Sequence, residues 1–235
     1  MKAGATQALA QILFSQGFGT RRHCAALIGA GQVQIDGVTQ NDPQTAFATD
    51  GLVIGVQGQP WPVHAKALVM LHKPAGYECS TKPRHHPGVL TLLPAPLRER
   101  GVQAVGRLDV DTTGLLLLTD DGALIHRLTS PKHHVAKVYE VTCKHPLAAD
   151  TVARLLAGVV LDDSPEPVCA LACEATAQDR LRLTLTEGRY HQVKRMLAAV
   201  GNRVEALHRS AFGDWMLPAD LAPGAWRWID GSAPN

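Results

Sequence analysis

The segment 104–122 constrains the fold of this chain more than any other stretch, because it joins a charged turn to a wholly apolar run. Four consecutive leucines, Leu115–Leu118, predict a short strand that is buried on both faces. Gly106 and Gly114 flank the charged residues and indicate places where the backbone turns or approaches a neighbour closely. Asp121-Gly122 predicts a turn after the strand. The segment therefore predicts a charged loop beside an interior strand.

Two charged residues of this loop, Arg107 and Asp109, lie two positions apart. In an extended segment, side chains at this spacing point to the same side. A carboxylate held on a short loop beside a buried strand is a candidate reaction centre. Spacing alone favours a simpler interpretation, an Arg–Asp ion pair that closes the end of the strand, because most such pairs are structural. Further motifs are needed to decide between the two.

Downstream of residue 67, the apolar pattern predicts more strands than helices. Predicted strands cover residues 68–72, 115–119, 135–143, 170–175 and 181–186, and predicted helices cover 148–157 and 190–200. The later helix is predicted to end at Gly201. Because helices do not regularly separate the strands, the pattern favours an α+β fold with a mixed sheet over a doubly wound fold.

The first 60 residues predict a separate compact module. Thr6 and Thr20 are candidate N-caps of two short helices, and strands are predicted at 33–37 and 52–56. Residues 57–64 are rich in Gly, Pro and polar side chains, which is typical of a linker. We therefore predict a small N-terminal domain over 1–60, a linker over 61–66 and a larger domain over 67–235.

Composition narrows the classes of protein that this chain can represent. The formal net charge is only +2, so RNA binding would depend on local patches rather than on a global basic field. The five cysteines are scattered and odd in number, which indicates reduced thiols in a cytoplasmic protein. No apolar run reaches the roughly 18 to 20 residues of a membrane span. Adjacent histidines lack further ligands at suitable spacing, so no metal site is predicted.

Four motifs follow one another in an order that is more specific than any of them alone. They are Lys73-Pro74-Ala75-Gly76-Tyr77, Gly106-Arg107-Leu108-Asp109 with the leucine run, Lys137-Val138-Tyr139, and the stretch from Glu187-Gly188-Arg189-Tyr190-His191 to Gln192-Val193-Lys194-Arg195-Met196. Together they resemble the pseudouridine synthases, in particular the family that modifies bacterial ribosomal RNA and carries an N-terminal S4-type domain. The resemblance implies a bent, mixed, largely antiparallel sheet with flanking helices, preceded by a small S4-like α/β module.

The resemblance also implies a reaction. Pseudouridine forms when the N1–C1′ bond of a uridine breaks and C1′ is rejoined to C5, so no atom is gained and no cofactor is needed. By resemblance, Asp109 is the catalytic carboxylate, Tyr139 stacks on the flipped base, and Lys194 pairs with Asp109 and keeps it ionised. The sequence leaves open whether the carboxylate attacks C1′, adds to C6 or assists elimination to a glycal.

Basic residues near these motifs are predicted to contact RNA. The expected substrate contacts in the larger domain are Arg107, Lys73, Arg84, Arg189, His191 and Arg195, and those in the S4-like module are Arg21 and Arg22. The three basic and three acidic residues of the module cancel, so we expect the module to bind RNA weakly on its own. Without the resemblance, Tyr139 would be an ordinary inward aromatic residue and Lys194 part of a solvated helix face.

The resemblance favours a uridine of 16S ribosomal RNA as the substrate, in partly assembled small subunits, with the protein acting as a monomer and without membrane contact. A related enzyme that acts on 23S ribosomal RNA is the alternative within the class, although such relatives often carry long basic C-terminal tails. A non-catalytic RNA-binding assembly factor is the alternative from another class. Hydrolysis of a glycosidic bond would need a paired acid, for which Asp111 is the nearest candidate.

Overall fold

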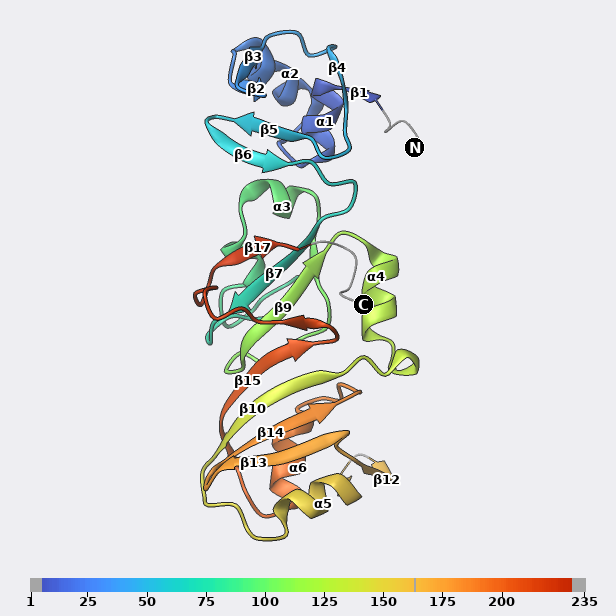
Figure 1. The fold of residues 1–235 in the computed structure, drawn as a ribbon, viewed down its shortest axis with the longest axis vertical. Coiled ribbons are helices and arrows are strands. Elements are labelled where there is room, and N and C mark those ends of the chain that lie inside the picture. Colours follow the sequence, from blue (N-terminus) through green and yellow to red (C-terminus); the bar gives the residue numbers. More distant parts are fainter. Residues whose placement is uncertain (1–5, 163, 230–235) are drawn as a thin grey trace. The chain divides into compact units, whose positions relative to one another are not determined.

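The computed structural model describes residues 6–162 and 164–229, and the chain forms two compact units (Figure 1). The N-terminal unit comprises the chain up to Ala67 together with Leu93–Val102. The larger unit comprises Leu68–Leu92 and the chain from Gln103 onward. The domain limits 1–60 and 67–235 therefore stay predictions, and nothing in the sequence pattern indicated that residues 93–102 join the N-terminal unit.

A short helix and an arginine hold this returning segment within the N-terminal unit. The helix is α3 (Ala95–Glu99). The guanidinium of Arg100 donates a hydrogen bond of 2.7 Å to Gln16 Oε1 and another of 3.0 Å to the carbonyl oxygen of His64. Gln16 is itself buried, so the arginine satisfies a polar group inside the unit.

Two helices and an antiparallel sheet make up the rest of the N-terminal unit. The helices are α1 (Leu9–Ser15) and α2 (Arg21–Gly29), the sheet has the order β3 (Val38–Gln40), β2 (Val33–Ile35), β5 (Val53–Val56), β6 (Gln59–Pro62), and a separate antiparallel pair joins β1 (Thr6–Ala8) to β4 (Ala46–Ala48). Leu9, Ile12 and Ile28 are fully buried between these elements. The apolar spacing of the helices therefore builds the core of this unit, as expected of short amphipathic helices.

One of the two predicted helix caps in this unit is confirmed and the other is wrong. Thr20 caps α2, and its hydroxyl accepts a hydrogen bond of 3.2 Å from the amide of His23. Thr6 instead lies in β1 opposite Ala48, and Ala8 precedes α1 without a side-chain cap. A β-branched residue suits a strand, which explains the difference. The strand β6 also occupies part of the stretch that was expected to be a linker.

A nine-stranded sheet forms the centre of the larger unit. Its order is β13 (Ala172–Ala177), β14 (Arg180–Leu185), β10 (Lys137–Cys143), β15 (Val204–Phe212), β9 (Thr113–Thr119), β7 (Leu68–Lys73), β17 (Trp226–Trp228), with β8 (Gln103–Ala104) beside β9 and β16 (Trp215–Met216) beside β15. Strands β9 and β15 run parallel, whereas the other described pairs of this sheet are antiparallel. The predicted α+β fold with a mixed, largely antiparallel sheet is confirmed.

Helices and short turns flank this sheet (Figure 1). They are α4 (Gly122–Thr129), α5 (Thr151–Ala157), α6 (Gln192–Ala199) and the 3₁₀ turns Val89–Leu92 and Pro131–His133, and a small antiparallel pair joins β11 (Val159–Leu161) to β12 (Ser164–Val168). Leu124 and Leu128 of α4 belong to the same apolar cluster as Leu115, Leu117 and Phe212. All four residues of Leu115–Leu118 are 0% exposed, which confirms a strand buried on both faces.

Two features of this unit differ from the sequence-based expectation. Asp121 does not form an isolated turn but begins α4, where its carboxylate accepts hydrogen bonds from the amides of Ala123 at 3.0 Å and Leu124 at 3.3 Å. The nine-residue strand β15 was not predicted. Its charged residues hide the apolar pattern that would identify a strand. One of them, Arg209, is nevertheless buried, and its Nε donates a hydrogen bond of 2.9 Å to the carbonyl oxygen of Leu115.

The predicted close approach at Gly114 is confirmed. This residue has a φ of +110°, and a Cβ there would collide with the backbone oxygen of Arg209. The absence of a side chain lets β9 and β15 lie in contact where they run parallel. This contact also fixes the start of β9, and with it the end of the loop that carries Asp109, beside β15.

Candidate active site

The loop that carries Asp109 is held from inside the larger unit by Lys73. This lysine ends β7 and is 0% exposed. Its three N–H groups lie within hydrogen-bonding distance of four carbonyl oxygens, those of Pro74 at 3.0 Å, Asp109 at 3.0 Å, Val110 at 3.3 Å and Thr112 at 2.8 Å. Burial lowers the pKa of Lys73, and the nearby carboxylates oppose this shift. The predicted substrate contact by Lys73 is not compatible with this burial, because the ammonium group faces the backbone of the loop.

The Asp109 carboxylate lies close to two basic side chains, those of Lys194 and His191. Its Oδ2 lies 3.3 Å from Lys194 Nζ, and its Oδ1 lies 3.4 Å from His191 Nε2. The Asp109 side chain is 29% exposed, so it is partly shielded from water yet open to a ligand. The structure therefore brings the Asp109 carboxylate and the Lys194 ammonium together, as the sequence motifs predicted, and it places His191 beside them.

Lys194 also binds Asp111, and these contacts are shorter than the contact to Asp109. The Lys194 Nζ donates to the two Asp111 carboxylate oxygens at 2.7 and 2.8 Å. Burial lowers the pKa of Lys194, but the hydrogen bond to Asp111 and the charges of both carboxylates outweigh it, so the net pKa is raised. Burial raises the pKa of Asp111, but the bond to Lys194 and its charge lower it overall. Lys194 therefore stays protonated between two carboxylates.

The start of α6 places Lys194 and His191 at this point. Val193, Met196 and Leu197 are buried, so the intervening Lys194 is directed away from the core. His191 precedes the helix with φ 49° and ψ 33°, a left-handed conformation that is unusual for a residue with a side chain. Strained backbone of this kind is enriched at functional sites. Here it turns the imidazole toward Asp109.

An open pocket with a volume of about 70 Å³ lies in front of these residues. Its lining comprises Arg107, Leu108, Asp109, Thr112, Tyr139, Leu185, Glu187, Gly188, Arg189, His191, Gln192, Val193, Lys194 and Leu207. Tyr139 lies on β10 and is only 8% exposed, whereas Arg107 is exposed at the pocket. Five of the predicted site residues of the larger domain besides Tyr139 thus converge: Arg107, Asp109, Arg189, His191 and Lys194.

Some residues of this pocket were missed by the sequence analysis. Glu187 accepts a hydrogen bond of 2.8 Å from Arg189 Nε, and Gln192 Oε1 accepts one of 2.8 Å from the Arg189 amide. Gln192 and Thr112 are more than 90% buried. Glu187, Gln192 and Thr112 all lie within the sequence motifs that contain the predicted site residues, and this position was the available signal. Arg189 is therefore fixed by neighbours rather than free.

Three predicted contact groups lie outside the pocket lining. Arg195 has its guanidinium 3.3 Å from the carbonyl oxygen of Tyr190. Arg84 is exposed on the loop 79–87 of the larger unit. Arg21 and Arg22 are exposed on α2 in the N-terminal unit, and the Arg21 guanidinium lies 5.0 Å from the ring centre of Phe14.

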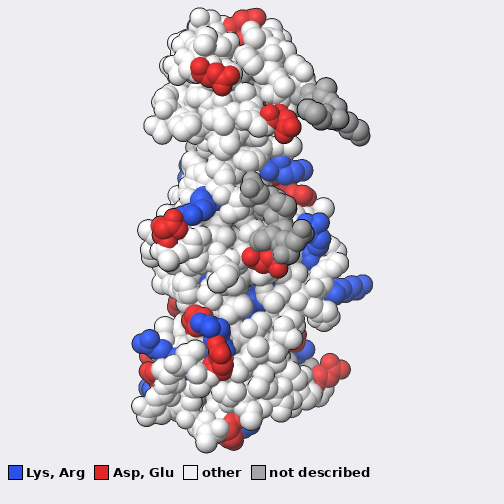
Figure 2. Space-filling model, in the orientation of Figure 1, with Lys and Arg blue, Asp and Glu red and all other residues white. Residues whose placement is uncertain are grey.

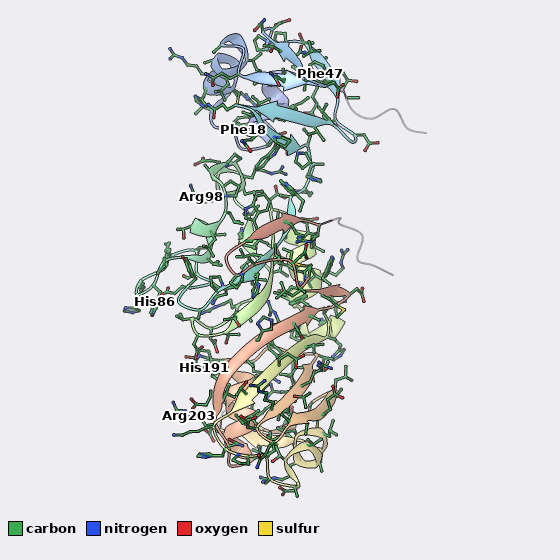
Figure 3. The ribbon with its side chains drawn as sticks, turned by 60° about the vertical axis from the view of Figure 1, so that its left-hand side comes forward. Phe18, Phe47, His86, Arg98, His191 and Arg203 are labelled. Carbon is green, nitrogen blue, oxygen red and sulfur yellow. The ribbon has the colours of Figure 1, made fainter. Side chains whose placement is uncertain are left out.

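The loop 79–87 is held by the carboxylate of Glu78. Its oxygens accept hydrogen bonds from the amides of Arg84 at 3.1 Å, His85 at 2.9 Å and His86 at 3.0 Å. These bonds lower the pKa of Glu78. The Glu78 amide also donates to the carbonyl oxygen of Pro87 at 3.0 Å. In Figure 3, the labelled His86, His191 and Arg203 project from one side of the larger unit.

The surface charge is local rather than global. On the face drawn in Figure 2, basic and acidic side chains are interspersed over the larger unit, and the N-terminal unit presents acidic groups without a broad basic patch. Over residues 6–162 and 164–229, no group of three or more His, Cys, Asp or Glu side chains is arranged to hold a metal ion. Within the same ranges, no helix has the length and apolar character needed to cross a membrane.

The fold and the pocket define the class of protein. Residues 67–199, more than half of the chain, match the family described as RNA pseudouridylate synthase, and the chain belongs to this family. A solved structure described as a crystal structure of pseudouridylate synthase matches with a TM-score of 0.68 at 35% identity, covering 96% of this chain and 97% of its own. The predicted isomerase class and fold are confirmed.

Within this family, the chain is similar to enzymes described as ribosomal small subunit pseudouridine synthases. The Ribosomal small subunit pseudouridine synthase A of Salmonella typhimurium is 47% identical over 185 residues, which is 79% of this chain and 77% of the relative. The protein of the same description from Escherichia coli K12 is 46% identical over the same shares. The one from Vibrio cholerae is 39% identical over 89% of this chain and 90% of its own.

Proposed function

We propose that this protein converts one uridine of 16S ribosomal RNA into pseudouridine. The observation that carries the reaction is the partly shielded Asp109 carboxylate, held between Lys194 and His191 in a pocket that Tyr139 also lines. The observation that carries the substrate is the 46–47% identity to small-subunit enzymes over most of the chain.

The reaction is balanced without a further reactant. The N1–C1′ bond breaks, the base turns, C1′ bonds to C5, the C5 proton leaves and N1 gains a proton. A carboxylate supports this sequence by attack at C1′, by addition to C6 or by assisting elimination to a glycal. Each route uses the Asp109 carboxylate, whose Oδ2 lies 3.3 Å from the Lys194 ammonium. No cofactor enters the proposal.

The other residues bind and orient the nucleotide. The target base must leave its stack, at a cost of a few kcal/mol, before the carboxylate reaches it. Arg107, exposed beside Asp109, is suited to displace the nucleotide or to fill the gap that it leaves. Tyr139 offers its ring to the flipped base. Arg189, Arg195 and Arg84 contact phosphates, and Lys73 is a positioning residue for the Asp109 loop.

The proposal includes the state of the substrate and of the enzyme. The enzyme acts as a monomer on partly assembled small subunits in the bacterial cytoplasm, where ribosomal RNA is made. Arg21 and Arg22 of the N-terminal unit add phosphate contacts outside the pocket. The near-neutral charge of residues 1–60 supports only weak binding by that part alone.

The test is chemical mapping of pseudouridine in 16S and 23S ribosomal RNA after incubation with the purified protein, as naked RNA and as assembling particles. We expect one new 16S site with the native protein and none with Asp109→Asn. Asp111→Asn is the matched control, since this carboxylate is two residues away, is 70% exposed and also binds Lys194. We expect it to retain the modification.

Each other outcome decides between the alternatives. A site in 23S ribosomal RNA would retain the reaction and overturn the substrate. RNA binding without any pseudouridine in either preparation would support a non-catalytic assembly factor. Release of free uracil would instead indicate glycosidic hydrolysis, with Asp111 as the second carboxyl group.

A further inference from the structure

We propose that the ring of Tyr190 is a stacking surface for an RNA base next to the target uridine, outside the pocket that holds the target itself. The inference rests on the proposed function, since it concerns how the same enzyme holds the same RNA. Tyr139 is not this surface, because it is 8% exposed and lies within the pocket.

The exposure of Tyr190 is unusual for so large an apolar side chain. Its relative exposure is 73%, although the residues before and after it make specific contacts in the site. Its hydroxyl makes no hydrogen bond within the described residues, so no polar contact explains its position. Covering the exposed ring with a ligand would remove apolar area from water, which is favourable.

One face of the Tyr190 ring is already fixed. It lies on the imidazole of His191, with ring centres 3.8 Å apart and an angle of 21° between the planes. His191 is in turn held by its left-handed backbone and by the contact of 3.4 Å to Asp109. The ring is therefore preorganised, with its second face toward solvent, and it would lose little conformational freedom when a base stacks on it.

The charges around Tyr190 favour a nucleic acid over an apolar partner. Arg189 precedes it, and the guanidinium of Arg195 donates to its carbonyl oxygen at 3.3 Å. Such a combination of an exposed aromatic ring with basic residues is typical of single-stranded RNA sites, where bases stack on rings and phosphates bind cations. The neighbours of a flipped uridine lose a stacking partner, and Tyr190 supplies one.

Tyr190→Ala and Tyr190→Phe separate stacking from other roles. Stacking on an aromatic ring contributes enough that we expect Tyr190→Ala to raise KM for the RNA roughly 5- to 100-fold, with kcat within about two-fold of native. Phenylalanine keeps the ring, so Tyr190→Phe should bind as the native protein does. Met216→Ala is the matched control, because Met216 is a 74% exposed apolar residue of the same unit. We expect it to change neither constant.

A fluorescent adenine analogue next to the mapped uridine reports stacking directly. We expect its emission to be quenched by Asp109→Asn protein, and the quenching to be lost when Tyr190→Ala is added. Unchanged KM and unchanged quenching in Tyr190→Ala would overturn the inference. A lower kcat at unchanged KM would also overturn it, since the ring would then act only by holding His191. If the RNA is bound but not modified, the Kd of a 16S ribosomal RNA fragment for native and Tyr190→Ala protein replaces KM, and an unchanged Kd would overturn the inference.

Discussion

Lys73 and Lys194 both contact the Asp109 loop, but they hold it by different physical means. Lys73 is fully buried and neutralises no carboxylate directly, because its ammonium binds four carbonyl oxygens of the backbone. Lys194 is 27% exposed and binds the side chains of Asp109 and Asp111. The first lysine fixes where the loop lies, and the second determines the charge that the loop presents. Shape and electrostatics of one site are thus assigned to separate residues.

The largest effect is expected for Lys73→Met. The substitution keeps most of the volume but removes the ammonium donor from the carbonyl oxygens of Pro74 and Thr112, whereas those of Asp109 and Val110 keep the backbone amides of Thr112 and Gly76 as donors. Each buried acceptor left without a donor costs about 1 to 3 kcal/mol. We expect a loss of about 3 kcal/mol or more in the free energy of unfolding, measured by urea denaturation. Activity should fall together with stability. Native-like stability would contradict the structural role of Lys73.

Lys194→Gln should show the opposite combination. Removing a partly exposed cation leaves the loop in place but takes a positive charge from Asp109, so we expect kcat to fall roughly 10²-fold. The urea midpoint should stay close to that of the native protein. Lys194→Arg keeps the charge and is the control, which should recover most of the rate. Equal losses in stability for Lys73→Met and Lys194→Gln would remove the distinction between the two lysines.

The three roles that the sequence motifs assigned met in one pocket, but the role of Lys73 could not be predicted. Its partners are carbonyl oxygens, and those of Asp109, Val110 and Thr112 lie more than thirty residues away in the sequence. Backbone groups carry no residue-specific signal, so a pattern of side chains does not reveal them. The leucine run of β9 was predictable because burial on both faces leaves a continuous apolar stretch.

Unlike β9, strand β15 could not be predicted from its sequence. Its sequence contains Glu205, His208 and Arg209, which obscures the alternation that identifies a strand. Arg209 is nevertheless 1% exposed, because its guanidinium lies 5.0 Å from the ring centre of Phe212 and donates to a carbonyl oxygen of β9. A charged residue can therefore occupy the interior when backbone and aromatic partners from a distant strand are present. Those partners are known only after the fold is known.

Glu78→Ala tests whether a carboxylate on backbone amides positions a loop as Lys73 does on backbone carbonyls. Glu78 is acidic, so its removal from an RNA-binding surface should strengthen binding if only charge mattered. Because three amides of the loop 79–87 depend on it, we expect several-fold weaker binding instead, with kcat retained. Asp214→Ala, which removes an exposed acid without such bonds, is the control. Tighter binding by Glu78→Ala would show that the loop needs no such support.

The smallest effect concerns Lys137, a buried lysine with a single carbonyl acceptor, that of Val135 at 2.8 Å. Burial and the charge of Arg209 lower its pKa from 10.5 to about 8. Between about pH 8 and pH 10.5, the Lys137 side chain binds more protons in the unfolded chain than in the folded one. The contribution of this side chain to the free energy of unfolding therefore rises with pH in this range. We expect the Tm of the native protein, relative to Lys137→Met, to increase from about pH 7 to about pH 10. A constant difference would mean that Lys137 titrates normally.

Because residues 93–102 belong to the N-terminal unit, a single cut in the chain does not separate the two units. The chain passes between the two units at residues 67, 92 and 102, so the N-terminal unit is discontinuous in the sequence. A gene fragment that ends near residue 67 lacks α3 and the Arg100 guanidinium that binds Gln16. Conversely, a protease cut between β6 and β7 leaves the two fragments joined through the 93–102 segment, and they should copurify. Exchange of this module between genes would require two insertions rather than one.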